Sequence, residues 1–227
     1  MDLNKLNFLN FEIHNKKTLP YLLTAMGCMY FLIITILAMF FYPGGYNFFT
    51  NFFSHLGLTQ VNGMPNPVSF LMFTSAVVIA GSLLVPFFIT IPKHVADNKF
   101  KKVLAWATTS FGVIVAIAYI GIGLAPTDIN GPAHGWCVLI AFTGTFPVIL
   151  VYAILIFLKK GIPKYVPYTF MFFTVMIFAY ILLMFFGPSR ETLEGLVINV
   201  VGQKIIIYTE MISMVIAGYG MAQYADR

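Results

Sequence analysis

The sequence predicts an all-α integral membrane protein with six transmembrane helices in one bundle and short interfacial helices on the outer side. Composition is the first indication, because hydrophobic residues make up 59% of the 227 residues and charged residues only 9%. The mean hydropathy is +0.88, whereas soluble domains carry about 25% charged residues. The second indication is that the apolar residues fall into six runs of roughly twenty residues, each long enough to cross about 30 Å of hydrocarbon as a helix. Helices are expected because backbone groups in lipid must pair within their own segment.

The six runs define a single domain over residues 1–227. The short connections on one side of the membrane favour antiparallel neighbouring helices in one compact bundle. In the third run, Gly112 and Ala116 are one helical turn apart and suit a close approach between helices. The predicted spans are 20–42, 67–91, 103–124, 135–158, 166–186 and 204–224.

The positive charges predict how the spans are oriented. All but two of the thirteen Lys and Arg residues lie at the two chain ends or in the connections after the second and fourth spans. The exceptions are Arg190 and Lys204. Short basic connections stay in the cytoplasm, so we predict a multi-pass protein of the cell membrane with both termini cytoplasmic. The net charge of +5 is then a property of the topology and predicts no nucleic-acid partner.

The first outer connection predicts a short helix near residues 47–57. Asn51, Ser54 and His55 are spaced at i, i+3 and i+4, which places them on one helical face. Phenylalanine and leucine residues form another, apolar face, and Gly57 provides a C-terminal stop. The polar face either lines a shared pocket or simply meets water at the membrane interface.

The second outer connection contains residues that suit both a turn and a chemical site. Asn130-Gly131 is a turn signal, and Pro132 suits the first turn of the fourth span. His134 would lie in that turn, where a neutral imidazole can accept a proton, donate a hydrogen bond or bind a metal. Asp128 either contributes to the same site or only caps the loop.

The third outer connection predicts another interfacial helix before the sixth span. Leucine and valine residues between 193 and 201 recur at helical spacing and form one apolar stripe. Arg190 and Glu194 are four residues apart and would form an ion pair on the solvated face.

Glu210 is the most informative single residue, because it lies well inside the sixth span. An acidic side chain there costs about 2.5–3.5 kcal/mol on insertion scales unless it is paired or protonated. We therefore expect Glu210 to face the bundle interior and to find a partner on another helix, in a functional or a purely structural hydrogen bond. Gln203 lies seven residues earlier and shares its face, while Lys204 points elsewhere and can snorkel to the outer surface.

Four motifs fall in the outer connections of the predicted bundle. They are Asn51-Phe-Phe-Ser-His-Leu-Gly57, Asn66-Pro67, Gly123-Leu-Ala-Pro-Thr-Asp128 with His134, and Gly202-Gln-Lys-Ile205. Together they resemble the membrane proteins of the domain-of-unknown-function 998 family. The resemblance covers essentially the whole chain, and it implies a distant similarity to the six-span DRAM-like and Frag-like group, which is associated with lipid and glycolipid-anchor handling. In the family a Gly followed by a charged pair tends to begin the sixth span, whereas here only Lys204 is charged.

The function favoured by these observations is binding or handling of a membrane lipid, or of a partner membrane protein, without catalysis. The high aromatic content of 17% and the amphipathic outer segments suit a lipid, a membrane-protein partner or a homo-oligomer. The binding residues would be Asn51, His55, Gln203, Lys204 and Glu210, in a polar pocket in the outer half of the bundle.

The alternative function is an intramembrane lipid hydrolase or transferase with Ser54, Asp128 and His134 as catalytic residues. A metal-assisted version would use His55, Asp128 and His134 as the three protein ligands of a catalytic zinc. No pair of these ligands has the tight spacing of a known metal motif. Adjacent helical residues such as Ser54 and His55 diverge by about 100°, which is a poor geometry for direct proton transfer between them. An ion-coupled transporter is a third possibility, supported only by the deep acid. The sequence identifies no cofactor.

Overall fold

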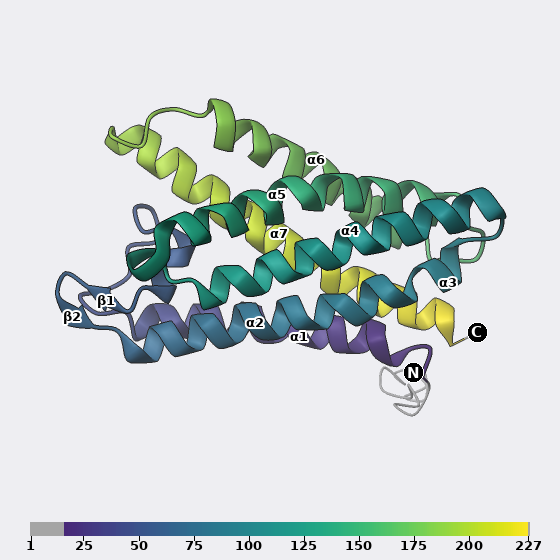
Figure 1. Cartoon of the computed structure of the whole chain (residues 1–227), viewed down its shortest axis with the longest axis horizontal. Coiled ribbons are helices and arrows are strands. Elements are labelled where there is room, and N and C mark those ends of the chain that lie inside the picture. Colours follow the sequence, from purple (N-terminus) through teal and green to yellow (C-terminus); the bar gives the residue numbers. More distant parts are fainter. Residues whose placement is uncertain (1–15, 227) are drawn as a thin grey trace, which may run out of the picture.

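Six long helices form the molecule, in a computed structural model that describes residues 16–226. All six are long and apolar enough to cross a membrane, which confirms the predicted fold class. The six long helices are α1 (Leu19–Phe40), α2 (Pro67–Thr90), α4 (Lys99–Leu124), α5 (Thr127–Phe157), α6 (Tyr165–Phe186) and α7 (Leu193–Ala225), and the four-residue α3 (Pro92–Val95) follows α2. In spatial order α1 packs on α2, α2 on α4, α4 on α5, α5 on α6, α6 on α7 and α7 back on α1, so the long helices close into a ring (Figure 1).

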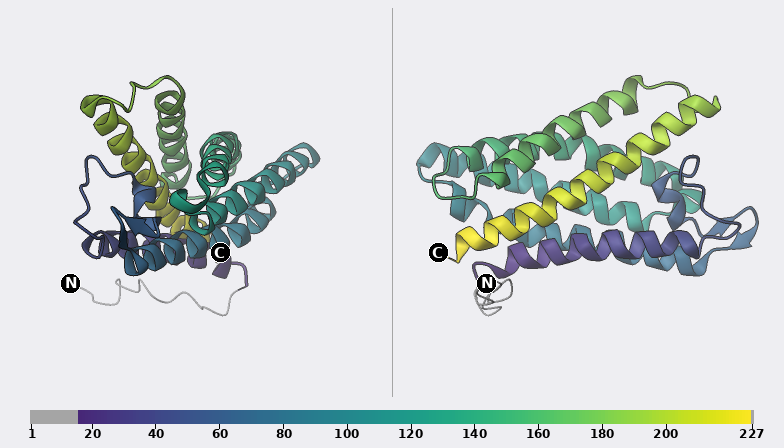
Figure 2. Two further views of the ribbon diagram at one scale, coloured as in Figure 1. Left: turned by 60° about the vertical axis from the view of Figure 1, so that its left-hand side comes forward. Right: turned by 180° about the vertical axis from the view of Figure 1, so that it is seen from behind.

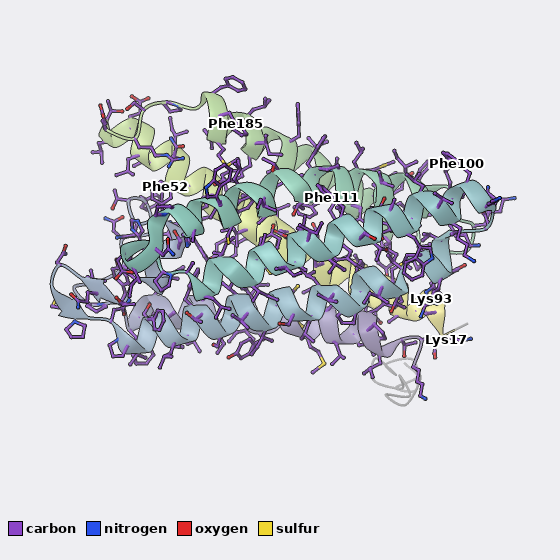
Figure 3. All side chains as sticks on the ribbon, viewed as in Figure 1. Lys17, Phe52, Lys93, Phe100, Phe111 and Phe185 are labelled. Carbon is purple, nitrogen blue, oxygen red and sulfur yellow. The ribbon has the colours of Figure 1, made fainter. Side chains whose placement is uncertain are left out.

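The two ends of the bundle differ in chemistry. The described ends of the chain and the connections around residues 91–98 and 158–164 lie together, and we call this the basic end (Figure 1). Lys17 and Lys93 lie there, whereas Phe52 lies at the opposite end (Figure 3). That opposite end carries a short 3₁₀ helix, η2 (Phe53–Gly57), and a small hairpin of β1 (Gln60–Val61) and β2 (Met64–Pro65), and we call it the hairpin end.

Local sequence chemistry explains where several helices begin. Proline occupies the first turn of α1 and of α2, where its missing N–H costs nothing. The side chain of Asn98 accepts a 2.8 Å hydrogen bond from the Lys101 N–H and caps α4. Thr192 caps α7 in the same way through the Gly195 N–H. Close packing then joins the helices, because a Cβ on Gly112 of α4 would lie 3.0 Å from the Phe88 ring on α2.

The hairpin was not anticipated, although the sequence contains its signal. Asn62 and Gly63 connect the two strands, and both have positive φ angles, of 50° and 79°. Asn-Gly is the dipeptide that favours a two-residue hairpin turn of this kind. The hairpin places the chain so that Asn66 can begin α2 directly after β2.

The predicted interfacial helix before the sixth span is wrong as a separate element. Residues 193–201 continue without a break into α7, which has 33 residues and crosses the bundle obliquely (Figure 2). The predicted ion pair between Arg190 and Glu194 is also not formed. Arg190 instead donates to Asn199 Oδ1 at 3.3 Å, and its guanidinium lies over the Phe52 ring. Arg190 therefore contacts Asn199 and the distant Phe52 ring and makes no ion pair with Glu194.

Candidate functional site

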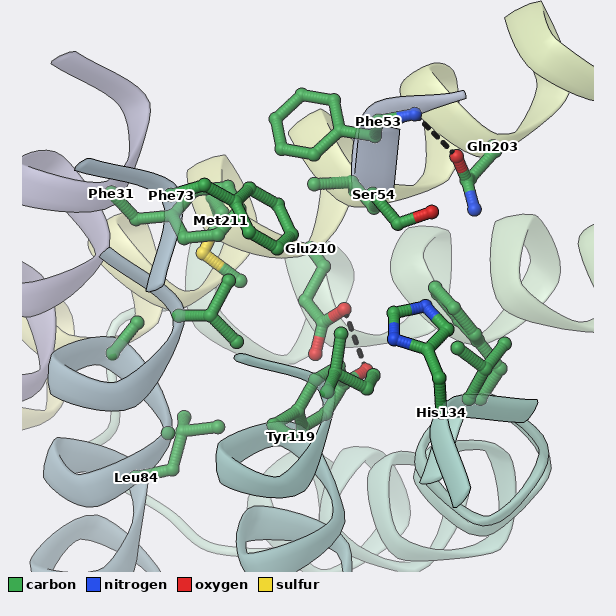
Figure 4. A pocket seen from close by; sticks show the side chains of 17 residues that line it. Phe31, Phe53, Ser54, Phe73, Leu84, Tyr119, His134, Gln203, Glu210 and Met211 are labelled. Carbon is green, nitrogen blue, oxygen red and sulfur yellow. Dashed lines mark hydrogen bonds between the residues drawn. The ribbon is translucent and has the colours of Figure 1, made fainter. Parts of the chain in front are cut away.

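A chamber lies inside the helix ring toward the hairpin end. Helices α1, α2, α4, α5 and α7 and the short helix η2 all contribute to its walls, which are mostly phenylalanine and aliphatic side chains. Its interior volume is about 50 Å³, and one buried water needs about 10–15 Å³. The chamber can therefore hold a few waters or one small polar group. The polar side chains that face it are Ser54, Tyr119, His134, Gln203 and Glu210 (Figure 4).

Glu210 is buried at the chamber wall with only 3% of its surface exposed. Its Oε2 accepts a 2.8 Å hydrogen bond from the Tyr119 hydroxyl on α4, and that hydroxyl also lies 3.2 Å from Thr145 Oγ1 on α5. No described residue donates a hydrogen bond to the other oxygen, Oε1. The expectation that Glu210 faces the interior and pairs with another helix is confirmed. Tyr119 itself was missed, and the signal was a tyrosine in the middle of an apolar span.

The backbone near His134 positions its imidazole ring. Asn130 has non-helical φ and ψ angles of −141° and 68°, and its side chain accepts from the Ala133 N–H, so a new helical segment starts there within α5. His134 thus lies in a first turn, as predicted. Its Nδ1 is 2.9 Å from the Ala125 carbonyl oxygen. Because a carbonyl only accepts, Nδ1 carries a proton, and in the neutral form of the ring Nε2 is the acceptor.

The short helix η2 closes the chamber at the hairpin end. Gln203 Oε1 accepts a 2.8 Å hydrogen bond from the Phe53 N–H and so joins η2 to α7. Ser69 on α2 donates to the Leu56 carbonyl at 3.0 Å, and Asn66 donates to the Leu58 carbonyl at 2.8 Å. Hydrogen bonds from two different helices therefore hold this cap in place.

Ser54 and His55 line different cavities. Ser54 faces the chamber, and its hydroxyl has no hydrogen-bond partner among residues 16–226. His55 and Asn51 line a separate recess of about 360 Å³ beside the hairpin. The predicted common face of these three residues is wrong, because successive residues of a 3₁₀ helix point about 120° apart and Asn51 lies before the helix begins. Burial lowers the pKa of His55 below its ordinary value of 6.5, and the nearby positive charge of Lys204 lowers it further.

Lys204 is buried under the loop that precedes η2. The expectation that it snorkels to the surface is wrong, because only 1% of the residue is exposed. Its Nζ donates to the Asn51 carbonyl at 2.5 Å and lies 5.3 Å from the Tyr46 ring centroid and 5.0 Å from that of Phe48. Lys204 therefore fastens this loop to α7 and does not line the chamber.

Asp128 also holds the fold together at the hairpin end. Its Oδ2 accepts hydrogen bonds from the Thr59 N–H at 2.8 Å, the Thr59 hydroxyl at 2.6 Å and the Gln60 N–H at 3.1 Å. The residue is exposed and does not line the chamber. Of the predicted catalytic set, Ser54 and His134 both line the chamber, whereas Asp128 lies at the hairpin.

The structure also does not assemble the three residues considered as metal ligands. Within residues 16–226, no three His, Cys, Asp or Glu side chains lie close enough together to hold a metal ion. Asp128 accepts hydrogen bonds from Thr59 and Gln60 at the start of the hairpin. His55 faces the recess, and His134 faces the chamber.

Comparison with known families gives a single result. Residues 25–219 match the family described as protein of unknown function (DUF998). The chain belongs to this family. No curated protein and no solved structure matches it, and the distant relation to the DRAM-like and Frag-like group stays a prediction.

The sequence motifs that carried the resemblance lie around the chamber and its cap in this structure. Residues 51–57 form its cap, and residues 202–205 contribute Gln203 and Lys204, which hold the cap. Residues 123–128 end α4, begin α5 and supply both the Ala125 carbonyl that orients His134 and the Asp128 carboxylate that anchors the hairpin. The resemblance in the sequence thus corresponds to one contiguous region of the fold.

Proposed function

We propose that this DUF998 protein binds a membrane lipid without chemically changing it, and that the polar end of the lipid enters the chamber. The observation that carries the proposal is a small group of hydrogen-bonding side chains enclosed by apolar walls within a bundle of six membrane-spanning helices. Ligand sites commonly combine apolar walls with a few polar groups that orient the ligand. A volume of about 50 Å³ suits a head group, so the hydrocarbon chain would lie between helices.

The orientation of the protein follows from its charges in this proposal. The basic end would face the cytoplasm, and both termini with it, because short Lys-rich connections are retained there. The chamber and its cap would then belong to the outer half of the membrane, and the lipid would come from the outer leaflet. The exposed phenylalanines of α6, such as Phe172 at 58%, suit contact with lipid, a partner membrane protein or a second copy of the chain.

Filling the chamber tests the proposal. Ala80 is buried at the chamber wall, and Ala80→Leu would occupy space that the head group needs. Ala107 on α4 is exposed, so Ala107→Leu adds the same atoms on the outside of the bundle. Native mass spectrometry of the purified proteins should show retained lipid on the wild type and on Ala107→Leu, and much less on Ala80→Leu. Equal lipid retention by all three proteins, or none by the wild type, would contradict the proposal.

A second candidate function is acyl transfer or hydrolysis, favoured by the orientation of His134. The Ala125 carbonyl holds Nδ1, which leaves Nε2 as a base on the chamber that Ser54 also lines. Ser54 Oγ would attack an ester carbonyl while Nε2 takes its proton and passes it to the departing alcohol. An alkyl fluorophosphonate should then label the wild type and not Ser54→Ala or His134→Ala. Absence of labelling on the wild type would remove this candidate.

A further inference from the structure

Glu210 has an incomplete set of partners for a carboxylate at its depth. Tyr119 donates to Oε2, but no described residue donates to Oε1, and Glu210 forms no salt bridge in the described chain. A buried charge is expensive unless a counter-charge or several hydrogen bonds compensate for it. The carboxylate of Glu210 and the imidazole of His134 both project into the chamber (Figure 4). The chamber therefore presents acceptor atoms that the protein itself does not use.

The chamber provides no positive charge of its own to pair with Glu210. No lysine or arginine of the described chain lines it. Lys204, only six residues earlier on the same helix, directs its Nζ to the Asn51 carbonyl and to two aromatic rings of the loop. Arg190 lies against Phe52 and Asn199 beyond the cap. A negatively charged ligand such as a phosphate or carboxylate would find no cationic side chain among the lining residues, and the Glu210 carboxylate would repel it.

Aromatic rings form a large part of the chamber wall. Phe31, Phe53, Phe73, Phe142 and Tyr119 all line it. The face of an aromatic ring carries a negative quadrupole that attracts cations, and the attraction strengthens when water is excluded. Aromatic walls, an unused carboxylate oxygen and the Nε2 acceptor of His134 thus favour the same kind of group, a cation that can donate hydrogen bonds.

We propose that the chamber recognises the protonated amine of a lipophilic molecule, with Glu210 Oε1 and His134 Nε2 accepting its N–H hydrogen bonds. This inference rests on the proposed lipid-binding function and names the head group. Tyr119 positions the carboxylate by holding its other oxygen. The amine belongs to a free long-chain amine or to an amino head group of a membrane lipid, since both present the same ammonium to the site.

A series of ligands that differ only in the head group tests this recognition. The full chain in phosphatidylcholine nanodiscs is titrated with octylamine, octanol, octanoate and octyltrimethylammonium, and partitioning into protein-free nanodiscs is subtracted. Octylamine should bind at least about tenfold more tightly than octanol, a ratio that corresponds to about 1.4 kcal/mol. Octanoate should be the weakest ligand, and octyltrimethylammonium should also bind less well than octylamine because it has no N–H to donate.

Variants of two glutamates on α7 separate the specific effect from a change in net charge. Glu210→Gln removes the charge inside the chamber and should bring the affinities for octylamine and octanol to within about threefold of each other. Glu194→Gln removes an equal charge at an exposed position and should keep the tenfold preference. If Glu210→Gln does not fold, the four ligands on the wild type still decide the question.

The outcomes that overturn the two proposals differ. Equal affinity of the wild type for octylamine and octanol, or an unchanged preference in Glu210→Gln, would overturn amine recognition and leave lipid binding intact. Binding of none of the ligands would overturn the proposed function itself. Repeating the octylamine titration in nanodiscs that contain phosphatidylethanolamine identifies the source of the amine. Weaker octylamine binding there would show that the lipid head group competes for the chamber, which assigns the amine to a lipid. Unchanged octylamine binding would assign it to a free long-chain amine.

Discussion

The hydroxyl of Tyr119 on α4 lies 2.8 Å from Glu210 Oε2 on α7, and this hydrogen bond joins helices that are not neighbours in the ring. Replacing Tyr119 with Phe would leave a buried carboxylate oxygen without a donor. We expect a loss of about 1–2 kcal/mol in the free energy of unfolding, measured by denaturation in detergent. Tyr30→Phe is the matched control, because that hydroxyl meets Ser75 at 3.1 Å and contacts no charge. Equal losses in both variants would contradict a special role for the Tyr119 bond.

Lys204 should control the loop before η2 more than it controls global stability. Lys204→Met keeps about the same side-chain length but removes the hydrogen bond to the Asn51 carbonyl and the positive charge that faces the Tyr46 and Phe48 rings. Replacing a buried charge by an apolar side chain is often neutral for stability overall. We therefore expect faster amide hydrogen exchange in residues 46–57 and little change in the unfolding midpoint. Lys160→Met, at an exposed position, should change neither quantity.

Asp128 should behave as a structural residue. Asp128→Ala removes the acceptor for three hydrogen bonds from Thr59 and Gln60, which we expect to cost about 1–2 kcal/mol. Lipid retention measured by native mass spectrometry should persist in the variant that remains folded. Asp97→Ala removes an exposed surface ion pair and should have no measurable effect. Loss of lipid from folded Asp128→Ala, with unchanged stability, would contradict this assignment.

His55 should make the protein less stable in acid. Because the pKa of His55 is lowered in the fold, the unfolded chain binds a proton below pH 6.5 that the folded protein does not yet bind. Stability should then fall as the pH drops through about 6.5 toward the folded pKa, and should be unaffected by His55 above it. Unfolding midpoints between about pH 7.5 and 5 measure this slope. His55→Gln should flatten it, and an unchanged slope would exclude His55 as its source.

The six spans and the inward position of Glu210 could be predicted because they depend on length, hydropathy and the cost of a charge in lipid. The partner of Glu210 could not, because periodicity within one segment does not say which other helix lies opposite it. Residues 193–201 show the same limit, since their apolar stripe suits an interfacial helix and the first turns of α7 equally well. The predicted surface position of Lys204 was wrong for a related reason. Its burial depends on Asn51 and on aromatic rings from a distant loop.

The chain length between Tyr46 and Phe53 is constrained by the way η2 closes the chamber. The Tyr46 hydroxyl, Lys204 and Gln203 fix the backbone at residues 51–53, and a 3₁₀ helix turns by about 120° per residue. Inserting or deleting a single residue just before Phe53 would rotate the following side chains by that angle. Ser54 would leave the chamber, and a neighbouring side chain would take its place. Loops usually tolerate changes of length, but in this one the residue count decides which side chain faces the inside of the protein.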